Sequence, residues 1–222
     1  MPTLRRVLAT AVGVVVALPA MTSCAEPDFR YAAERAGSAP AGTVYFKVPQ
    51  AWAEFPAAQI VTAEKGWTAG PDAAALLGAT AWQAAYDAAP TPSLDHVLGR
   101  AAPDRPVVYA SLRSLYAEEQ AGATTTALKD MLVPVSTLGS TVRVTTDAAV
   151  TQGSASGVHL VYTYAPAPGL PEETIDQTAY LSDGRDAVYL LVVRCTTTCY
   201  AEHRDEIATV TASYTIEEGR SG

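Results

Sequence analysis

Positive charge is scarce in this chain. Its 222 residues carry 15 Lys and Arg against 23 Asp and Glu, which gives a net charge of −8 at pH 7. No nucleic-acid partner is expected, because phosphate binding requires a basic face. The hydrophobic content of 49% is that of a folded globular protein rather than of a disordered chain.

The N-terminal apolar run is too short to cross a membrane as a helix. Val7–Ala20 has fourteen residues, whereas a spanning helix needs roughly 20. The run follows Arg5 and Arg6 and ends in small residues, which is the pattern of a secretory signal peptide. We therefore expect residues 1–23 to direct export and to be removed.

The end of this signal carries the tetrapeptide Met21-Thr22-Ser23-Cys24, in which a large apolar residue and two small ones precede a cysteine. It resembles the lipobox of bacterial lipoproteins, although leucine is more usual than methionine at the first position. The resemblance implies that Cys24 becomes the acylated N-terminus and anchors the protein on the outer face of the cell membrane. The alternative is ordinary cleavage near Ser23–Ala25 without acylation.

Charge would not hold the mature chain at a membrane. Removing residues 1–23 takes away Arg5 and Arg6 and no acid, so the net charge becomes −10. Such a surface adds no general attraction to anionic lipids, so the acyl chains would have to hold the protein there.

Only two cysteines remain besides Cys24. Cys195 and Cys199 are separated by three residues, and outside the cytoplasm such a pair is most simply a structural disulfide. A zinc site would need four ligands, and His203 is the only imidazole nearby; a redox pair more typically has two intervening residues. We expect a disulfide that stabilises the fold by about 2 kcal/mol on the chain-entropy model.

The mature chain divides into a spacer and a folded domain. Residues 24–42 are rich in Ala, Gly, Pro and charge, which predicts an acylated N-terminus followed by a flexible tether. Residues 43–222 have a length that suits a single domain. This domain opens with the alternating segment Val44–Val48, a strand that Pro49 ends.

Strands dominate the expected fold. The clearest unit is a hairpin of Asp176–Leu181 and Asp186–Cys195, in which Asp183-Gly184 is expected to supply the positive-φ positions. Its second strand is apolar on both faces and should lie at the centre of the sheet. The pattern predicts an α+β fold, a mostly antiparallel sheet with one or two helices packed on it. Further strands are expected at Thr80–Ala88, Pro106–Leu112, Thr141–Thr146, Val158–Tyr164 and Ser213–Ile216, and helices at Pro71–Leu77, Thr124–Leu132 and Cys199–Thr211.

Val48-Pro49 and Trp52 close the first strand, and the Tyr180–Tyr189 hairpin and the segment Ile207–Ile216 follow later in the chain. In this order the elements resemble the PsbP-like fold, shared by the extrinsic photosystem subunit and by LpqN-type lipoproteins of actinobacteria. The likeness covers roughly Thr43–Glu217 and implies a non-catalytic accessory or binding protein outside the membrane. It transfers no functional residue, because such apolar and turn residues specify a fold rather than a function.

The histidines do not form a catalytic constellation in the sequence. His96 follows Asp95 without a third group, His159 is a lone strand residue, and His203 shares a helical stripe with apolar residues. No two histidines have the spacing of a helical zinc site. We therefore expect no catalytic residue, no metal site and no cofactor.

The segment Gly153-Ser154-Ala155-Ser156-Gly157 looks at first like a nucleophile elbow. The pattern fails because Ala155 stands where the nucleophilic serine would be. We expect a flexible turn there.

Tyrosine is the abundant aromatic residue, with eleven Tyr against three Phe. Tyrosine can pack while its hydroxyl stays hydrated, so Trp52, Trp82, Tyr109 and Tyr162 are candidates to face a ligand; the alternative is an ordinary core. The sequence favours a non-catalytic binding or accessory protein that contacts an envelope protein or a small apolar ligand. A lipid or small-molecule carrier with an apolar pocket is the alternative, and a hydrolase is less favoured.

Overall fold

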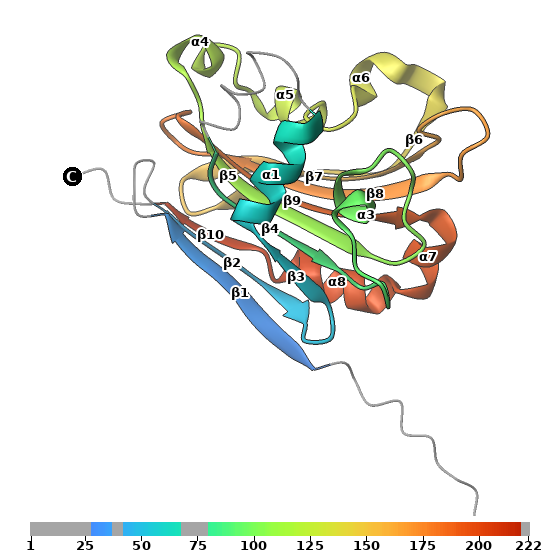
Figure 1. The fold of residues 1–222 in the computed structure, drawn as a ribbon. Helices are drawn as coiled ribbons and strands as arrows, with labels where there is room; N and C mark the ends of the chain where they lie inside the picture. The colour runs from blue at the N-terminus through green and yellow to red at the C-terminus, as the bar shows by residue number, and fades with distance from the viewer. Residues whose placement is uncertain (1–27, 37–41, 68–79, 219–222) are drawn as a thin grey trace, which may run out of the picture.

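The computed structural model describes residues 28–36, 42–67 and 80–218, and it contains two antiparallel sheets that face one another (Figure 1). The smaller sheet, in the order β1-β2-β10, consists of β1 (Phe29–Ala36), β2 (Gly42–Pro49) and β10 (Thr215–Glu218). The larger has the order β3-β4-β5-β9-β8-β7-β6. Its strands are β3 (Ala53–Pro56), β4 (Thr80–Asp87), β5 (Val107–Ser114), β6 (Val142–Gln152), β7 (Ala155–Tyr164), β8 (Glu173–Leu181) and β9 (Ala187–Thr196).

Helices cover both faces of the seven-stranded sheet, which confirms the α+β fold class. The three-stranded sheet shares one face with α7 (Thr197–Glu202) and α8 (Arg204–Ala212), and the helices of the opposite face include α1 (Ala57–Trp67). Helices are more numerous than the one or two expected, but most have only four to six residues. Besides α1, α7 and α8, the helices are α3 (Leu94–Leu98), α4 (Ala117–Gln120), α5 (Thr125–Lys129) and α6 (Val135–Leu138). A 3-10 turn at Gly139–Thr141 follows α6.

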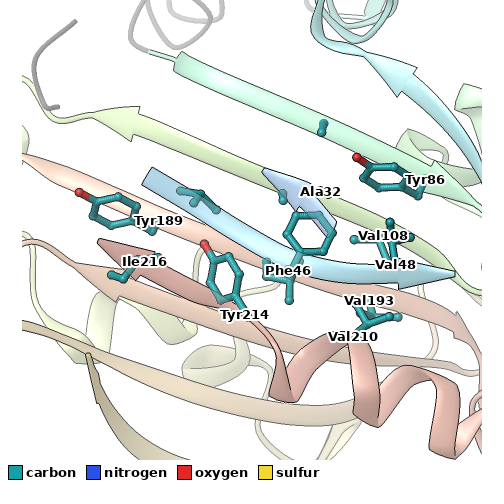
Figure 2. Packing of buried hydrophobic residues seen from close by; sticks show 14 of the residues in the cluster. Ala32, Phe46, Val48, Tyr86, Val108, Tyr189, Val193, Val210, Tyr214 and Ile216 are labelled. Carbon is teal, nitrogen blue, oxygen red and sulfur yellow. The ribbon is translucent and has the colours of Figure 1, made fainter. Parts of the chain in front are cut away.

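The main core lies between the two sheets (Figure 2). Alternation along β2 directs Val44, Phe46 and Val48 inward. The Phe46 ring lies edge-on to Tyr86 of β4, at 5.8 Å between centroids, and to Tyr214 at 6.3 Å. The first predicted strand therefore forms as expected and joins the two sheets through its apolar face.

Strand β9 occupies the middle position of the seven-stranded sheet, as its apolar sequence predicts. Leu191 and Val193 pack into the core between the sheets, whereas Leu190 and Val192 belong to a second core on the other face. The Cys195–Cys199 disulfide joins the end of this strand to α7, with 5.9 Å between the Cα atoms. Both cysteines are buried, so the bridge closes one end of the main core.

The structure corrects the expected boundary between tether and domain. Residues Phe29–Ala36 form β1, which pairs with β2 along its whole length, so this part of the expected tether is a strand. Its pairing depends on backbone hydrogen bonds and on the buried side chain of Ala32, and the Ala-rich composition conceals both. Cys24 and the helix expected at Pro71–Leu77 lie outside the described residues.

Three local predictions also need correction. In the β8–β9 hairpin, the positive φ of 55° falls on Arg185 rather than on the Asp183-Gly184 pair. The helix expected over Cys199–Thr211 is two helices, because His203 has φ −103° and ψ 19° and interrupts it. Thr124 does cap α5 as expected, but the helix ends at Lys129 rather than near Leu132.

Candidate ligand-binding site

A pocket of about 310 Å³ lies on the face of the seven-stranded sheet that is turned away from the three-stranded sheet. Strand alternation assigns it to that face: Val108 and Val193 pack between the sheets, whereas their neighbours Tyr109 and Val192 line the pocket. The walls come from α3, β5, β7, β8, β9 and the segment after α5. They consist of Val97, Leu98, Tyr109, Leu132, Val133, Tyr164, Ile175, Val192 and Arg194.

One wall is attached to the sheet by a buried hydrogen bond beneath α5. Gln177 of β8 is fully buried, and its Nε2 donates to the backbone oxygen of Leu128 at 2.6 Å. At the other end of α5, the Thr124 hydroxyl accepts from the backbone N–H of Ala127 at 3.0 Å. These contacts fix α5 in place, and the chain that follows the helix supplies Leu132 and Val133 to the wall.

Arg194 of β9 forms another wall, and four of its five N–H donors are used within the protein. Its Nε donates to Oε1 of Glu173, and its Nη1 donates to the backbone oxygens of Val97 at 3.2 Å and Gly99 at 2.8 Å. Its Nη2 donates to the backbone oxygen of Ala101 at 3.0 Å. The guanidinium therefore ties the segment that follows α3 to the sheet.

Two polar atoms near this wall are buried without a hydrogen-bond partner among the described residues: Glu173 Oε2 and Tyr162 Oη. Burial raises the pKa of Glu173, and the neighbouring Arg194 offsets part of that rise. Burial likewise raises the pKa of Tyr162 far above its ordinary value, and the nearby Tyr164 and Glu173 add to the rise. Both groups favour their neutral forms more than they would in water.

Smaller pockets lie on the same face of the sheet as this one. A pocket of about 290 Å³ shares Tyr164 and Arg194 with it and extends to Gly99, Pro166 and Leu170. A third, of about 190 Å³, lies beside α5 between Leu128 and Val188. The pocket at Tyr109 has the more apolar walls of the two that meet at Arg194, so it is the candidate site.

The four aromatic residues expected to face a ligand lie in different places. Tyr109 lines the pocket, and its hydroxyl donates to Oε1 of Gln83 at 3.0 Å. Tyr162 lies on the same face but is fully buried and does not line the pocket. Trp52 and Trp82 pack in or against the main core on the opposite face.

Sequence reasoning missed Ile175 and Arg194 as residues of the site. Tyr164 lies two residues after Tyr162 on β7, and Arg194 lies two residues after Val192 on β9. Because side chains alternate between the two faces of a sheet, each points to the same face as the residue two positions before it. The signal was therefore present along each strand. The adjacency of the strands is what the sequence did not show.

Each histidine pairs with a carboxylate, but none lines the pockets described above. His96 Nδ1 lies 2.8 Å from Asp87 Oδ2 rather than beside Asp95, and His203 Nδ1 lies 3.0 Å from Glu206 Oε2. In the third pair, His159 Nε2 lies 2.8 Å from Asp176 Oδ1.

A tyrosine also contacts the carboxylate of the pair formed by His159 and Asp176. The Tyr200 hydroxyl donates to the second oxygen of Asp176 at 2.8 Å. The hydrogen bond to Asp176 raises the pKa of His159, against the effect of burial. Neither this group nor any other in the described part of the chain brings together three His, Cys, Asp or Glu side chains as a metal site would require.

The candidate pocket offers contact surface rather than reactive groups. Among the described residues, its walls hold six aliphatic side chains, two tyrosines and one arginine, and include no serine, cysteine, histidine or carboxylate. Nucleophilic or acid–base catalysis needs such groups within hydrogen-bond reach of the substrate. The arrangement is suited to binding.

No helix of the described residues is long and apolar enough to cross a membrane. No family model matches the chain, and a search of curated proteins also finds no match.

The solved structures that resemble the chain include the following three, all at low identity. LpqN of Mycobacterium tuberculosis, described as involved in cell envelope biogenesis, has 15% identity and a TM-score of 0.47, over 85% of this chain and 91% of that one. Cyanobacterial PsbP of Synechocystis sp. PCC 6803 has 10% identity and a TM-score of 0.45, over 84% and 92%. The Ran-binding protein Mog1p of Saccharomyces cerevisiae has 9% identity and a TM-score of 0.43, over 85% and 96%. TM-scores below 0.5 do not establish a shared fold, so these likenesses assign neither family nor function, and the PsbP-like fold stays a prediction.

Proposed function

We propose that this protein is a lipid-anchored binding protein on the outer face of the cell membrane that holds a small, largely apolar, uncharged ligand. The observation that carries the proposal is the pocket of about 310 Å³ whose walls are mainly aliphatic. Ligand sites are typically apolar cavities of about 300–1,000 Å³ with a few polar groups that orient the ligand. A volume at the lower end of that range suits a small molecule, or one segment of a larger amphiphile.

The preference for an uncharged ligand follows from how the polar groups are used. Of the described residues that line the pocket, Arg194 is the one with a charged side chain, and it already bonds to Glu173 and to three backbone oxygens. Among the described residues these four bonds leave one Nη2 N–H, so an anionic ligand could gain a single hydrogen bond from Arg194 without breaking them. Burying a charge without a partner costs far more than apolar contacts return, so a neutral ligand fits better.

The proposal treats the protein as non-catalytic, and the composition of the pocket walls supports this. The three histidine–carboxylate pairs are separate from those walls. Purified protein screened with ester, peptide and glycoside substrates should show no turnover. Activity that survives purification and disappears in His96→Ala, His159→Ala or His203→Ala would contradict this part of the proposal.

Anchoring is assigned to Cys24 from the signal sequence and its lipobox-like end. Wild-type protein should fractionate with membranes, and Cys24→Ser should release it in soluble form. Equal membrane association of the two would contradict the anchor.

Ligand binding is tested by placing a charge at the mouth of the pocket. Leu132 lines the pocket and is 42% exposed, so Leu132→Asp can be accommodated without burying the carboxylate. Leu138→Asp is the matched control, because Leu138 is 38% exposed in α6 and does not line the pocket. The two variants differ mainly in whether the new charge meets the ligand.

Two measurements then apply to each variant: the affinity for the neutral apolar dye Nile red, and mass spectrometry of organic extracts from protein purified out of its native envelope. Wild type and Leu138→Asp should bind the dye and retain an apolar compound. Leu132→Asp should bind the dye at least about tenfold more weakly, because a carboxylate would replace an apolar side chain that contacts the dye. Equal binding by all three proteins, or by none of them, would refute the pocket as the functional site.

A further inference from the structure

We propose that the outer face of the three-stranded sheet rests on the headgroup region of the bilayer, so that the ligand pocket opens on the side away from the membrane. This inference relies on the acylation of Cys24 proposed above. It concerns a surface, formed by β1 and β2, that takes no part in the pocket.

The chain between the anchor and the fold is short. Only four peptide steps separate Cys24 from Asp28, and β1 begins at Phe29. An extended chain spans at most about 3.3–3.6 Å per residue, so Asp28 lies within about 14 Å of the acylated cysteine. Because β1 is a strand rather than part of a long tether, the three-stranded sheet must begin close to the lipid headgroups.

The outer face of this sheet carries aromatic residues and a lysine near that end. Val44, Phe46 and Val48 point inward along β2, so Tyr45 and Lys47 point outward. On β1, Tyr31 is directly opposite Lys47 in the register and is 63% exposed, the largest exposure among the large hydrophobic residues of the described chain. These three side chains, Tyr31, Tyr45 and Lys47, are called the tyrosine–lysine patch below.

The members of the patch contact one another rather than an acidic neighbour. The rings of Tyr31 and Tyr45 meet edge-to-face at 6.5 Å between centroids, and Lys47 Nζ lies 5.7 Å from the centroid of Tyr31. Lys129, by contrast, has its Nζ 2.6 Å from Asp147 Oδ2. Among the side chains that the structure describes, which belong to residues 28–33, 42–63 and 80–218, none forms an ion pair with Lys47.

A lipid surface fits this chemistry. Tyrosine is enriched at the membrane–water interface, where its ring sits among the headgroups and its hydroxyl stays wet. A lysine extends its ammonium to lipid phosphates while its stem covers apolar surface, and gains about 1 kcal/mol near an anionic leaflet. The patch is therefore a local exception on a chain that is acidic overall, and it lies beside the anchor.

Docking by this face fixes the direction of the pocket. The inner side of the three-stranded sheet packs on one face of the seven-stranded sheet, through residues such as Phe46 and Val193. The pocket opens on the other face, beside α5, and Figure 1 shows β1 and α5 on opposite sides of the larger sheet. The ligand would be exchanged with the space outside the membrane, and not by direct movement out of the lipid layer beneath the protein.

Amine footprinting tests this orientation with an internal control. Lys47, Lys65 and Lys129 are the lysines of the chain, and Lys129 lies on the pocket side in α5. Acylated protein bound to vesicles of equal parts phosphatidylethanolamine and phosphatidylglycerol is treated with a membrane-impermeant acetylating reagent, and peptides are quantified by mass spectrometry. Cys24→Ser protein with the same vesicles is the unanchored reference.

Labelling of Lys47 should fall about fivefold on anchoring, while labelling of Lys129 stays unchanged. Tyr31→Asp should restore most of the Lys47 labelling without releasing the anchored protein, and Leu138→Asp, on the opposite side, should not. Anchored protein with unprotected Lys47 would overturn the docking surface and leave the proposed function intact. Absence of an acyl group on Cys24 of exported protein, seen by mass spectrometry, would overturn both.

Discussion

Replacing Arg194 with methionine should produce a loss of stability that depends on pH in a defined direction. Met keeps much of the length of the side chain but removes its charge and its donors. Glu173 would then be a carboxylate whose side chain is 1% exposed and has no cation beside it. Removing one partner of a buried ion pair typically costs about 3–5 kcal/mol, a large part of a total stability of about 5–15 kcal/mol.

The pH dependence follows from the same carboxyl group. Burial already raises the pKa of Glu173 while Arg194 opposes the rise, so Arg194→Met should raise that pKa further. A raised folded pKa means that the folded state holds the proton more tightly than the unfolded state. The stability linked to this proton is fully present below the ordinary pKa of glutamate, and is lost as the pH rises through the raised value. The penalty of Arg194→Met should therefore be largest near neutral pH and above, and smaller in mild acid.

Urea denaturation near pH 5 and near pH 8 measures both effects. Glu173→Gln should cost less than Arg194→Met, because it leaves no buried carboxylate and the amide oxygen can still accept from Arg194. Arg113→Met is the matched arginine control: its partner Glu119 is 30% exposed at 2.8 Å, so the cost should stay below about 1 kcal/mol. A loss under about 1 kcal/mol for Arg194→Met, or an equal loss at both pH values, would refute this account of the pair.

Three further variants test other parts of the fold. His159→Asn should destabilise the protein in mild acid, because the hydrogen bond to Asp176 raises the pKa of His159 in the folded state. The difference in urea midpoint between the variant and wild type should narrow as the pH rises above about 6.5 through that raised pKa. A difference that does not depend on pH would contradict this account. Thr124→Ala removes the cap of α5 and should cost about 0.5–2 kcal/mol, with unchanged stability as the contrary result. The double variant Cys195→Ala with Cys199→Ala should lose about 2 kcal/mol under non-reducing conditions, whereas wild type treated with a reductant should approach it; equal stability of oxidised wild type and variant would show that the disulfide does not stabilise the fold.

The fold was largely predictable because its strands carry local signals. Alternation along Val44–Val48 and the doubly apolar run in β9 depend only on neighbouring residues, and both strands formed where expected. The Gly153–Gly157 segment shows the limit of that reasoning. Gly153 has the positive φ of a turn, but Gly157 lies within β7, where an added Cβ would be 2.1 Å from the backbone oxygen of Ala179. That glycine is required by a neighbouring strand, which local sequence does not reveal.

The candidate site was less predictable, because it depends on strand order. Tyr109 and Val192 are adjacent only because β5 pairs with β9, a partner far away in the sequence. Composition identified Tyr109 as an aromatic residue suited to a cleft, but it did so equally for Trp52, which is in the main core. An arginine near the end of an apolar strand gives no sign that it will bond to the backbone oxygens of Val97 and Gly99, nearly a hundred residues earlier. Proximity in the fold, rather than residue type, separates these cases.

Several buried polar side chains hold the walls of the pocket in place, a role that would be overlooked if they were considered only as catalytic groups. Asp87 has a fully buried side chain and accepts hydrogen bonds from His96 and from the backbone N–H groups of Ala89, at 2.8 Å, and Ser93, at 2.9 Å. It therefore shapes the turn that leads into α3, and α3 supplies Val97 to the pocket.

Gln177 and Arg194 act in the same way on the other walls. Gln177 attaches α5 to the sheet, and Arg194 attaches the segment after α3. Apolar packing alone would tolerate several arrangements of such short helices, whereas a buried polar group is satisfied in only a few. The walls of the pocket are thus held by polar contacts to a rigid sheet while the surface they present is apolar. Asp87 and Gln177 fix the shape of the pocket without lining it, whereas Arg194 does both, and support of this kind favours a cavity that is formed before anything binds.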